Sequence, residues 1–166
     1  MGTHMIAHTD RDDSQKVMNA IRRIVRALRI SSRAVERELG LSGAQLFVLQ
    51  KLKQSSALSV KELAERTLTH QSSVSVVVSR LVERGLADRR LSPTDGRQVE
   101  LTLTTEGLAL LGKAPRTAQE SLVEAISGLP AAQRALLGQL LSEVVSRAGL
   151  SSEPPALFFE NEGERS

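Results

Sequence analysis

Residues 59–104 constrain the fold of this 166-residue chain more than any other part of its sequence. They open with Ser59 and, three residues later, Glu62, which is the spacing of a capping box. In that motif the hydroxyl and the carboxylate each accept a hydrogen bond from an amide at the start of a helix. A helix is therefore expected to begin near Val60, and the polar break at residues 67–70 should end it.

A second helix is expected after this break, because its apolar residues recur with the i, i+3, i+4, i+7 spacing of one buried stripe. The stripe consists of Val74, Val77, Val78 and Leu81. Gly85 should end the helix, because glycine readily takes the left-handed conformation found after a helix C-terminus. Two helices with so short a break predict a helix-turn-helix.

The opposite face of the second helix has short or amide side chains and lacks carboxylates. It consists of Gln71, Ser72, Ser75, Val76 and Ser79. Such a face can approach duplex DNA closely, since hydroxyls reach phosphates or base edges, glutamine pairs with adenine and valine contacts the thymine methyl group. The alternative is a serine-rich face that only contacts solvent, as on most amphipathic helices.

A β-hairpin with a basic tip is predicted next. Residues 86–91 and 98–103 have the composition and partial alternation of half-buried strands, and residues 92–97 between them are rich in turn formers.

This segment resembles the winged helix-turn-helix of the multiple antibiotic resistance regulator (MarR) family of bacterial transcription factors. The resemblance is carried by Asp-Gly-Arg at residues 95–97, Leu-Thr-Thr-Glu-Gly at 103–107 and the lead-in Ser-Arg-Leu-Val-Glu-Arg-Gly-Leu at 79–86. It implies a mainly α fold, in which N- and C-terminal dimerisation helices flank a winged helix-turn-helix with a small β-hairpin wing. It also implies a homodimer that binds double-stranded DNA, with a pseudo-palindromic operator as its target.

The resemblance assigns DNA contacts to three places in the chain. In the helix-turn-helix they are Thr69, His70, Gln71, Ser72, Ser73, Ser75, Val76, Ser79 and Arg80. In the wing they are Arg89, Arg90, Asp95 and Arg97. Ser42 is added because the amides at a helix N-terminus attract phosphate.

Two of these assignments leave alternatives open. The family more often has Ser, Thr or Asp at the position of His70, so either Thr69 caps the helix or His70 contacts phosphate; an ordinary surface histidine is the other interpretation. In the wing, Asp95 is placed to pair with Arg97 and direct its guanidinium into a narrow minor groove. Alternatively, Asp95 is only a turn former and Arg97 is one of several diffuse phosphate contacts.

The N-terminal part predicts one long helix, from about Asp13 to Leu39, which Gly40 ends. Its apolar stripe consists of Val17, Ile21, Ile24, Val25, Leu28, Val35 and Leu39. Its opposite face carries Arg22, Arg26, Arg29, Arg33 and Arg37. These arginines either contact only solvent or bind a phosphate or carboxylate partner.

Ser42 and Gln45 form a second capping box, which predicts a helix over residues 43–54. By the family resemblance, a small aromatic or phenolic effector binds between the DNA-binding lobe and the dimerisation helices. The residues assigned to this pocket are Met18, Arg22, Arg26 and Phe47.

After the wing, Thr104 should cap a helix that Pro115 kinks or breaks near Lys113. A last apolar helix is expected over residues 131–148. These terminal helices carry more apolar surface than one lobe can bury, which favours a homodimer.

The expected organisation has five parts. They are a cloning remnant (1–5), an N-terminal dimerisation helix (6–41), the DNA-binding lobe (42–104), C-terminal dimerisation helices (105–150) and an acidic tail (151–166). The tail contains an apolar segment, Leu157-Phe158-Phe159, which is expected to dock on the dimer.

Composition disfavours other function classes. The chain lacks Cys, which excludes disulfides and thiolate metal sites, and its three His are scattered, so neither a metal centre, a catalytic pair nor a cofactor is expected. The net charge of +3 is compatible with a polyanionic partner without requiring one. The sequence also lacks a long apolar run and a signal peptide, so no membrane association is expected and the protein should be cytoplasmic.

The expected function is a sequence-specific DNA-binding regulator, a dimeric repressor released by a small aromatic or phenolic ligand. The alternative is a winged-helix module for protein interaction or architecture without ligand sensing.

Overall fold

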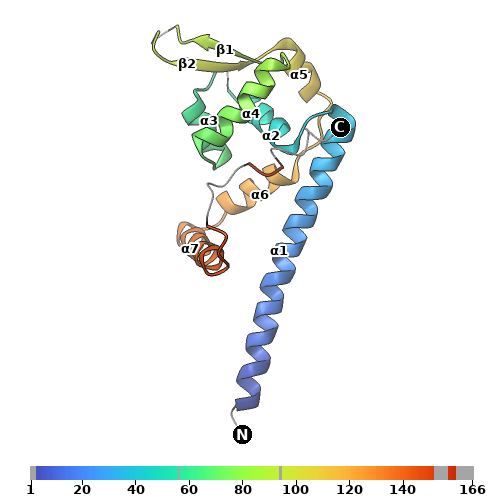
Figure 1. Cartoon of the computed structure of the whole chain (residues 1–166), viewed down its shortest axis with the longest axis vertical. Helices are drawn as coiled ribbons and strands as arrows, with labels where there is room; N and C mark the ends of the chain where they lie inside the picture. The colour runs from blue at the N-terminus through green and yellow to red at the C-terminus, as the bar shows by residue number, and fades with distance from the viewer. Residues whose placement is uncertain (1–2, 56, 94, 152–156, 160–166) are drawn as a thin grey trace.

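The computed structural model describes residues 3–55, 57–93, 95–151 and 157–159. Its elements in chain order are α1 (Thr3–Leu39), α2 (Gly43–Lys53), α3 (Val60–Thr67), α4 (Gln71–Glu83), β1 (Ala87–Leu91), β2 (Val99–Leu103), α5 (Thr105–Leu111), α6 (Ala118–Ser127) and α7 (Ala131–Arg147). Figure 1 shows α1 extending as a long rod from a helical lobe, with the β-hairpin at the far end of that lobe. The fold is the predicted one, a mainly helical winged helix-turn-helix with terminal helices on both sides.

Both helices of the helix-turn-helix form where the sequence predicted them. At the start of α3, Glu62 N–H donates to Ser59 Oγ at 3.2 Å and Ser59 N–H donates to Glu62 Oε2 at 2.8 Å, which confirms the capping box. The hydrogen bonds from Ser59 stabilise the carboxylate and lower the pKa of Glu62. The cap is therefore intact at neutral pH and weakens as the pH falls through that lowered pKa.

The core is built around α2, which packs against the other helices of the lobe and against β2. On α4, the predicted apolar stripe is fully buried; it consists of Val74, Val77, Val78 and Leu81. Burial of one such side chain contributes about 1.5–3 kcal/mol, so the stripe decides which face of α4 stays outside.

The wing is an antiparallel hairpin in which Ala87 lies opposite Leu103 and Leu91 lies opposite Val99. A further backbone contact was not predicted from the sequence: Leu58 N–H donates to Leu101 O at 3.1 Å, and Leu101 N–H donates back to Leu58 O at 2.7 Å. This bridge attaches the base of the wing to the segment that precedes α3.

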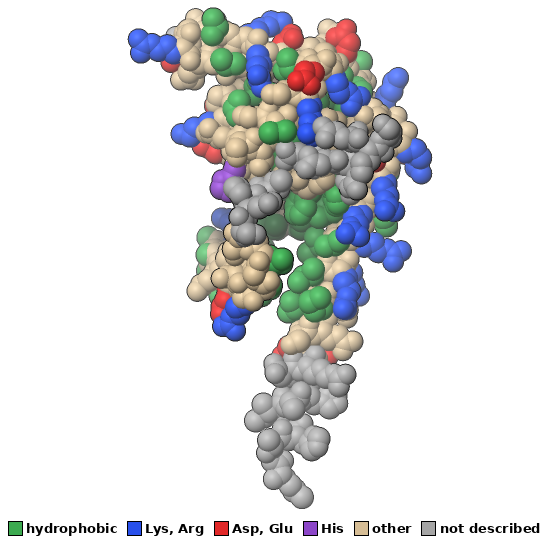
Figure 2. Space-filling model, in the orientation of Figure 1, with side chains coloured by type: hydrophobic (Ala, Val, Ile, Leu, Met, Phe, Trp, Pro, Cys, Tyr) green, Lys and Arg blue, Asp and Glu red, His purple; other side chains and the backbone are tan. Residues whose placement is uncertain are grey.

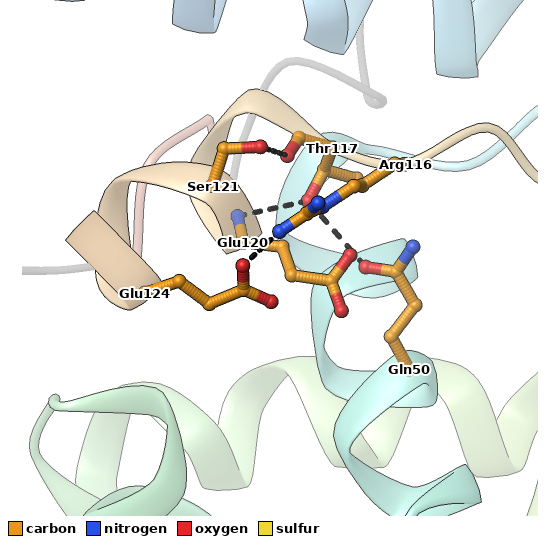
Figure 3. Close-up of polar contacts among 6 residues, drawn as sticks. All are labelled: Gln50, Arg116, Thr117, Glu120, Ser121 and Glu124. Atoms are coloured by element: carbon orange, nitrogen blue, oxygen red, sulfur yellow. Dashed lines mark hydrogen bonds and ion pairs between the residues drawn. The ribbon is translucent and has the colours of Figure 1, made fainter. Parts of the chain in front are cut away.

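The helix predicted after the wing is broken into α5 and α6, separated by residues 112–117, so the predicted break near Pro115 is confirmed. Thr117 caps α6, because Glu120 N–H donates to its hydroxyl oxygen at 3.1 Å. The same hydroxyl donates to Gln50 Oε1 of α2 at 3.4 Å (Figure 3). The break is thereby held against the core.

The first helix begins earlier than predicted, at Thr3 instead of near Asp13. Residues 3–12 contain neither Gly nor Pro, so their sequence has no strong signal that would stop the helix. At the other end, Gly40 has a φ of 64° and ends the helix as predicted.

Two terminal helices leave a large apolar surface open in the single chain. Every residue of α7 is exposed, including Leu136, Leu137, Leu140, Leu141, Val144 and Val145. On α1 the exposed apolar residues include Val17, Met18, Ile24 and Val25. Figure 2 shows the apolar side chains of α1 on the side toward α7 and its Lys and Arg side chains on the opposite side. The predicted division of α1 into an apolar and a basic face is confirmed.

Candidate nucleic-acid interface

The outer face of α4 is open to solvent. Gln71, Ser72 and Val76 are exposed, and Ser75 is half-buried between them. Ser73, which the sequence also assigned to DNA, is only 9% exposed and belongs to the inner side of the helix. We therefore remove Ser73 from the direct contacts, since a helix that places residues 74, 77 and 78 in the core turns its neighbour at 73 inward as well.

Ser79 and Arg89, both predicted DNA contacts, bind each other. Arg89 Nη2 donates to Ser79 Oγ at 2.8 Å, and that hydroxyl donates to Ser75 O at 2.9 Å. These hydrogen bonds connect β1 to α4, so they set the angle between wing and recognition helix. Ser79 thus has a positioning role in this structure, and its hydroxyl is already engaged.

His70 is the N-cap residue of α4, but its side chain makes no capping hydrogen bond. The alternative in which Thr69 caps this helix is therefore wrong. In the turn, Leu68 takes a left-handed conformation with a φ of 53°, and Thr69 N–H donates to Ala64 O at 3.0 Å. A helix start without a side-chain cap is suited to accept an anion such as a phosphate.

The tip of the wing differs from the predicted ion pair. Asp95 Oδ1 accepts the backbone N–H of Arg97 at 3.1 Å, and Asp95 Oδ2 accepts Gln98 Nε2 at 3.2 Å. Among the residues that the structure describes, the Arg97 guanidinium makes no hydrogen bond or ion pair. Asp95 is thus the turn former of the alternative interpretation, because its short carboxylate reaches the amide two residues ahead. Arg97 is exposed and available to a ligand.

The other two predicted contacts in the wing, Arg89 and Arg90, are exposed on β1. Arg90 lies 3.4 Å from the carboxylate of Asp88, and both side chains are largely exposed. An ion pair of this kind contributes little to stability, so Arg90 can exchange this partner for a phosphate.

Arg84 makes contacts within the lobe that its sequence neighbourhood did not predict. It is the C-cap of α4, and its Nη1 donates to Gly40 O at 2.6 Å and to Gln45 Oε1 at 3.4 Å. These contacts connect the end of the recognition helix to the junction of α1 and α2. Because Arg84 is exposed, these hydrogen bonds contribute about 1 kcal/mol or less, but they link the end of α4 to α1. The only sequence signal was its place in the Arg-Gly-Leu turn.

Two predicted site residues are buried. Ser42 is 3% exposed, and its hydroxyl accepts Gln45 N–H at 3.1 Å while Gln45 Oε1 accepts Ser42 N–H at 3.0 Å. The second capping box is confirmed, but Ser42 has no accessible group for phosphate. Phe47 is fully buried in the core, with Lys51 Nζ 5.2 Å from its ring centroid. We correct both assignments, since capping and core packing already occupy these side chains.

The remaining candidates for an effector pocket lie on α1. Arg22 and Arg26 line a groove together with Val25, Arg29, Ile30 and Arg33. Met18 is exposed on the same helix. Of the described residues, none of the His, Asp and Glu side chains form a cluster that could hold a metal ion. In the same part of the chain, no helix is both long and apolar enough to cross a membrane.

The exposed face of α4, the arginine-bearing hairpin and the terminal helices define a winged helix-turn-helix protein. A family profile described as MarR family matches residues 39–98. The uncharacterised HTH-type transcriptional regulator ML2140 of Mycobacterium leprae is 34% identical over 118 residues, which cover 71% of this chain and 80% of ML2140. The chain belongs to the MarR family of transcription regulators.

Other relatives agree with this assignment. The HTH-type transcriptional repressor MdtR of Bacillus subtilis is 41% identical over 68 residues, and that match covers 41% of this chain and 44% of MdtR. Among solved structures, apo MarR from E. coli has a TM-score of 0.54 at 25% identity, over 76% of this chain and 95% of that one. Bordetella bronchiseptica BpsR has a TM-score of 0.55 at 29% identity, over 77% and 91% of the two chains.

Proposed function

We propose that this protein is a transcriptional repressor that binds a specific sequence in duplex DNA as a homodimer. The observation that carries this proposal is the exposed, carboxylate-free face of α4 beside a wing whose Arg97 guanidinium has no partner among the described residues. A variant of E. coli MarR with a similar fold has been solved in complex with operator DNA, which supports the proposal. The cytoplasm is the compartment in which such a regulator acts.

In the proposed complex, α4 enters the major groove and the wing reaches the adjacent minor groove. Gln71 and Val76 contact base edges, while Ser72, Ser75 and His70 contact bases or phosphates near the uncapped start of the helix. Arg80, Arg89 and Arg90 add phosphate contacts at the edges. Two such helices, related by the dimer axis, require half-sites about 10 bp apart or a multiple of that spacing.

The test is filter binding of labelled duplex of random sequence at two salt concentrations, with wild type, Arg97→Ala and Arg97→Lys. Because binding neutralises phosphates, wild-type affinity should fall by about 10³-fold or more between roughly 50 and 200 mM salt. Arg97→Ala should weaken binding to this duplex by about 1–3 kcal/mol. Arg97→Lys should lose most of that amount too, since a planar guanidinium fits a narrow minor groove and an ammonium does not.

A matched control is Arg37→Ala, which removes one exposed arginine from α1 instead of the wing. It should leave DNA affinity within about twofold of wild type. If Arg97→Lys binds DNA with the affinity of wild type, Arg97 is only a diffuse phosphate contact. Absence of binding by wild type at any salt concentration would favour a protein-interaction module instead.

We further propose that a small aromatic or phenolic compound releases the repressor from DNA. The support is BpsR, whose DNA binding is described as regulated by 6-hydroxynicotinic acid. On this chain, Met18, Arg22 and Arg26 are the proposed contacts, since guanidinium groups bind carboxylates well. A thermal-shift screen of phenolic and pyridine carboxylic acids tests this, because a ligand at about 100 times its Kd adds about 2.7 kcal/mol of stability. If none of these acids raises the Tm of the protein, the proposal is contradicted.

A further inference from the structure

The segment Leu157–Phe159, which was predicted to dock on the dimer, lies against the lobe of its own chain. Leu157 is only 5% exposed and is part of the hydrophobic core. Leu157 and Phe158 line a pocket of about 380 Å³ whose other walls are Thr67, Leu68, Thr69, His70 and Gln119. In Figure 1 the segment is the short red piece close to α6. The segment therefore forms one wall of this pocket, next to the residues of α6 and of the helix-turn-helix turn that form the others.

The turn is a place where such a contact affects the recognition helix directly. Leu68 has a φ of 53°, a conformation that costs a non-glycine residue about 1–2 kcal/mol, so neighbouring contacts must hold it. Thr67 is buried and its hydroxyl donates to Leu63 O at 2.8 Å. Leu157 and Phe158 line the pocket beside this turn. Anything docked here also lies beside His70, the first residue of the uncapped start of α4.

Two properties of the docked segment oppose DNA at this end of α4. Phe158 is 49% exposed and lines the same pocket as His70, so its ring lies near the start of α4. The sequence then continues with Glu160, Glu162 and Glu164. These carboxylates follow the segment in the sequence and add negative charge to it, and negative charge repels phosphates.

We infer that the surface formed by the turn and α6 is a docking site for the chain's own C-terminal segment, and that docking inhibits DNA binding. This inference rests on the proposed function as a DNA-binding protein. The docked segment and a phosphate backbone compete for the N-terminal end of α4. The segment competes through the ring of Phe158 and through the negative charge of the glutamates that follow it in the sequence.

The experiment uses the full chain with Phe158→Ala, which removes an exposed ring without opening the core. If the docked, inhibited state is populated to about 80%, its loss should tighten DNA binding about fivefold in fluorescence anisotropy with a fixed duplex. A second variant, with Glu160, Glu162 and Glu164 all replaced by Gln, should also tighten binding, and its gain should shrink at high salt. Glu106→Gln, an exposed carboxylate on α5, is the control and should leave affinity unchanged.

Hydrogen exchange of the turn amides at residues 68–71 supplies a readout that does not depend on DNA. It should be faster in Phe158→Ala, because the docked segment protects the turn. If wild type binds DNA and Phe158→Ala binds it equally well or more weakly, the inference is wrong. Failure of wild type and all variants to bind any duplex would instead overturn the proposed function.

Discussion

Replacement of Gly107 by alanine is expected to destabilise the protein by about 3 kcal/mol, the upper range for a substitution that overpacks a closed site. A Cβ at this position would overlap the carbonyl oxygen of Leu86 and would lie only 3.1 Å from the carbonyl carbon of the same residue. The neighbouring atoms cannot move easily, because Thr104 N–H donates to Leu86 O at 3.3 Å and Gly107 N–H donates to Thr104 Oγ1 at 3.0 Å. The clash would separate the wing from α5.

Gly96→Ala is the matched control, since a Cβ there meets nothing within 4 Å. It should change the free energy of unfolding by less than about 0.5 kcal/mol. Thermal unfolding at one fixed protein concentration measures both variants, and Gly107→Ala should lower Tm by roughly 6–12 °C. Equal Tm values for the two variants would show that the junction between wing and α5 can relax around a methyl group.

Replacement of Leu140 by aspartate is expected to convert a dimer into monomers and to weaken DNA binding by about 100-fold or more. Leu140 lies in the exposed apolar stripe of α7, a helix without a buried residue in the single chain. If a second copy covers this stripe, aspartate there buries an unpaired charge, which dimerisation cannot tolerate. A monomer retains one recognition helix and loses the gain from binding two half-sites together.

Sedimentation velocity at micromolar concentration, together with DNA affinity, measures this effect. Gln139→Asp is the control, because residue 139 lies on the opposite side of α7 from the leucine and valine stripe. It should remain dimeric and bind DNA like wild type. A monomeric wild-type protein at this concentration would contradict the proposed homodimer.

Local sequence determined the elements of this fold and most of their boundaries. The capping boxes at Ser59 and Ser42, the left-handed glycine at Gly85 and the break near Pro115 all lie where they were predicted. Each depends on hydrogen bonds or backbone preferences among residues a few positions apart, so the sequence of that segment is sufficient. The periodic valines of α4 likewise determined which face of the recognition helix is buried.

Only the tertiary structure decided which side chains at the site are available. Nothing near Arg89 in the sequence shows that its guanidinium binds Ser79, and Arg84 reaches Gly40 across 44 positions. The burial of Phe47 and the docking of Leu157 depend in the same way on elements that meet only after folding. Periodicity identifies the face of a helix that is buried, but the partner of a long side chain depends on the distances and angles between elements, which local sequence does not encode.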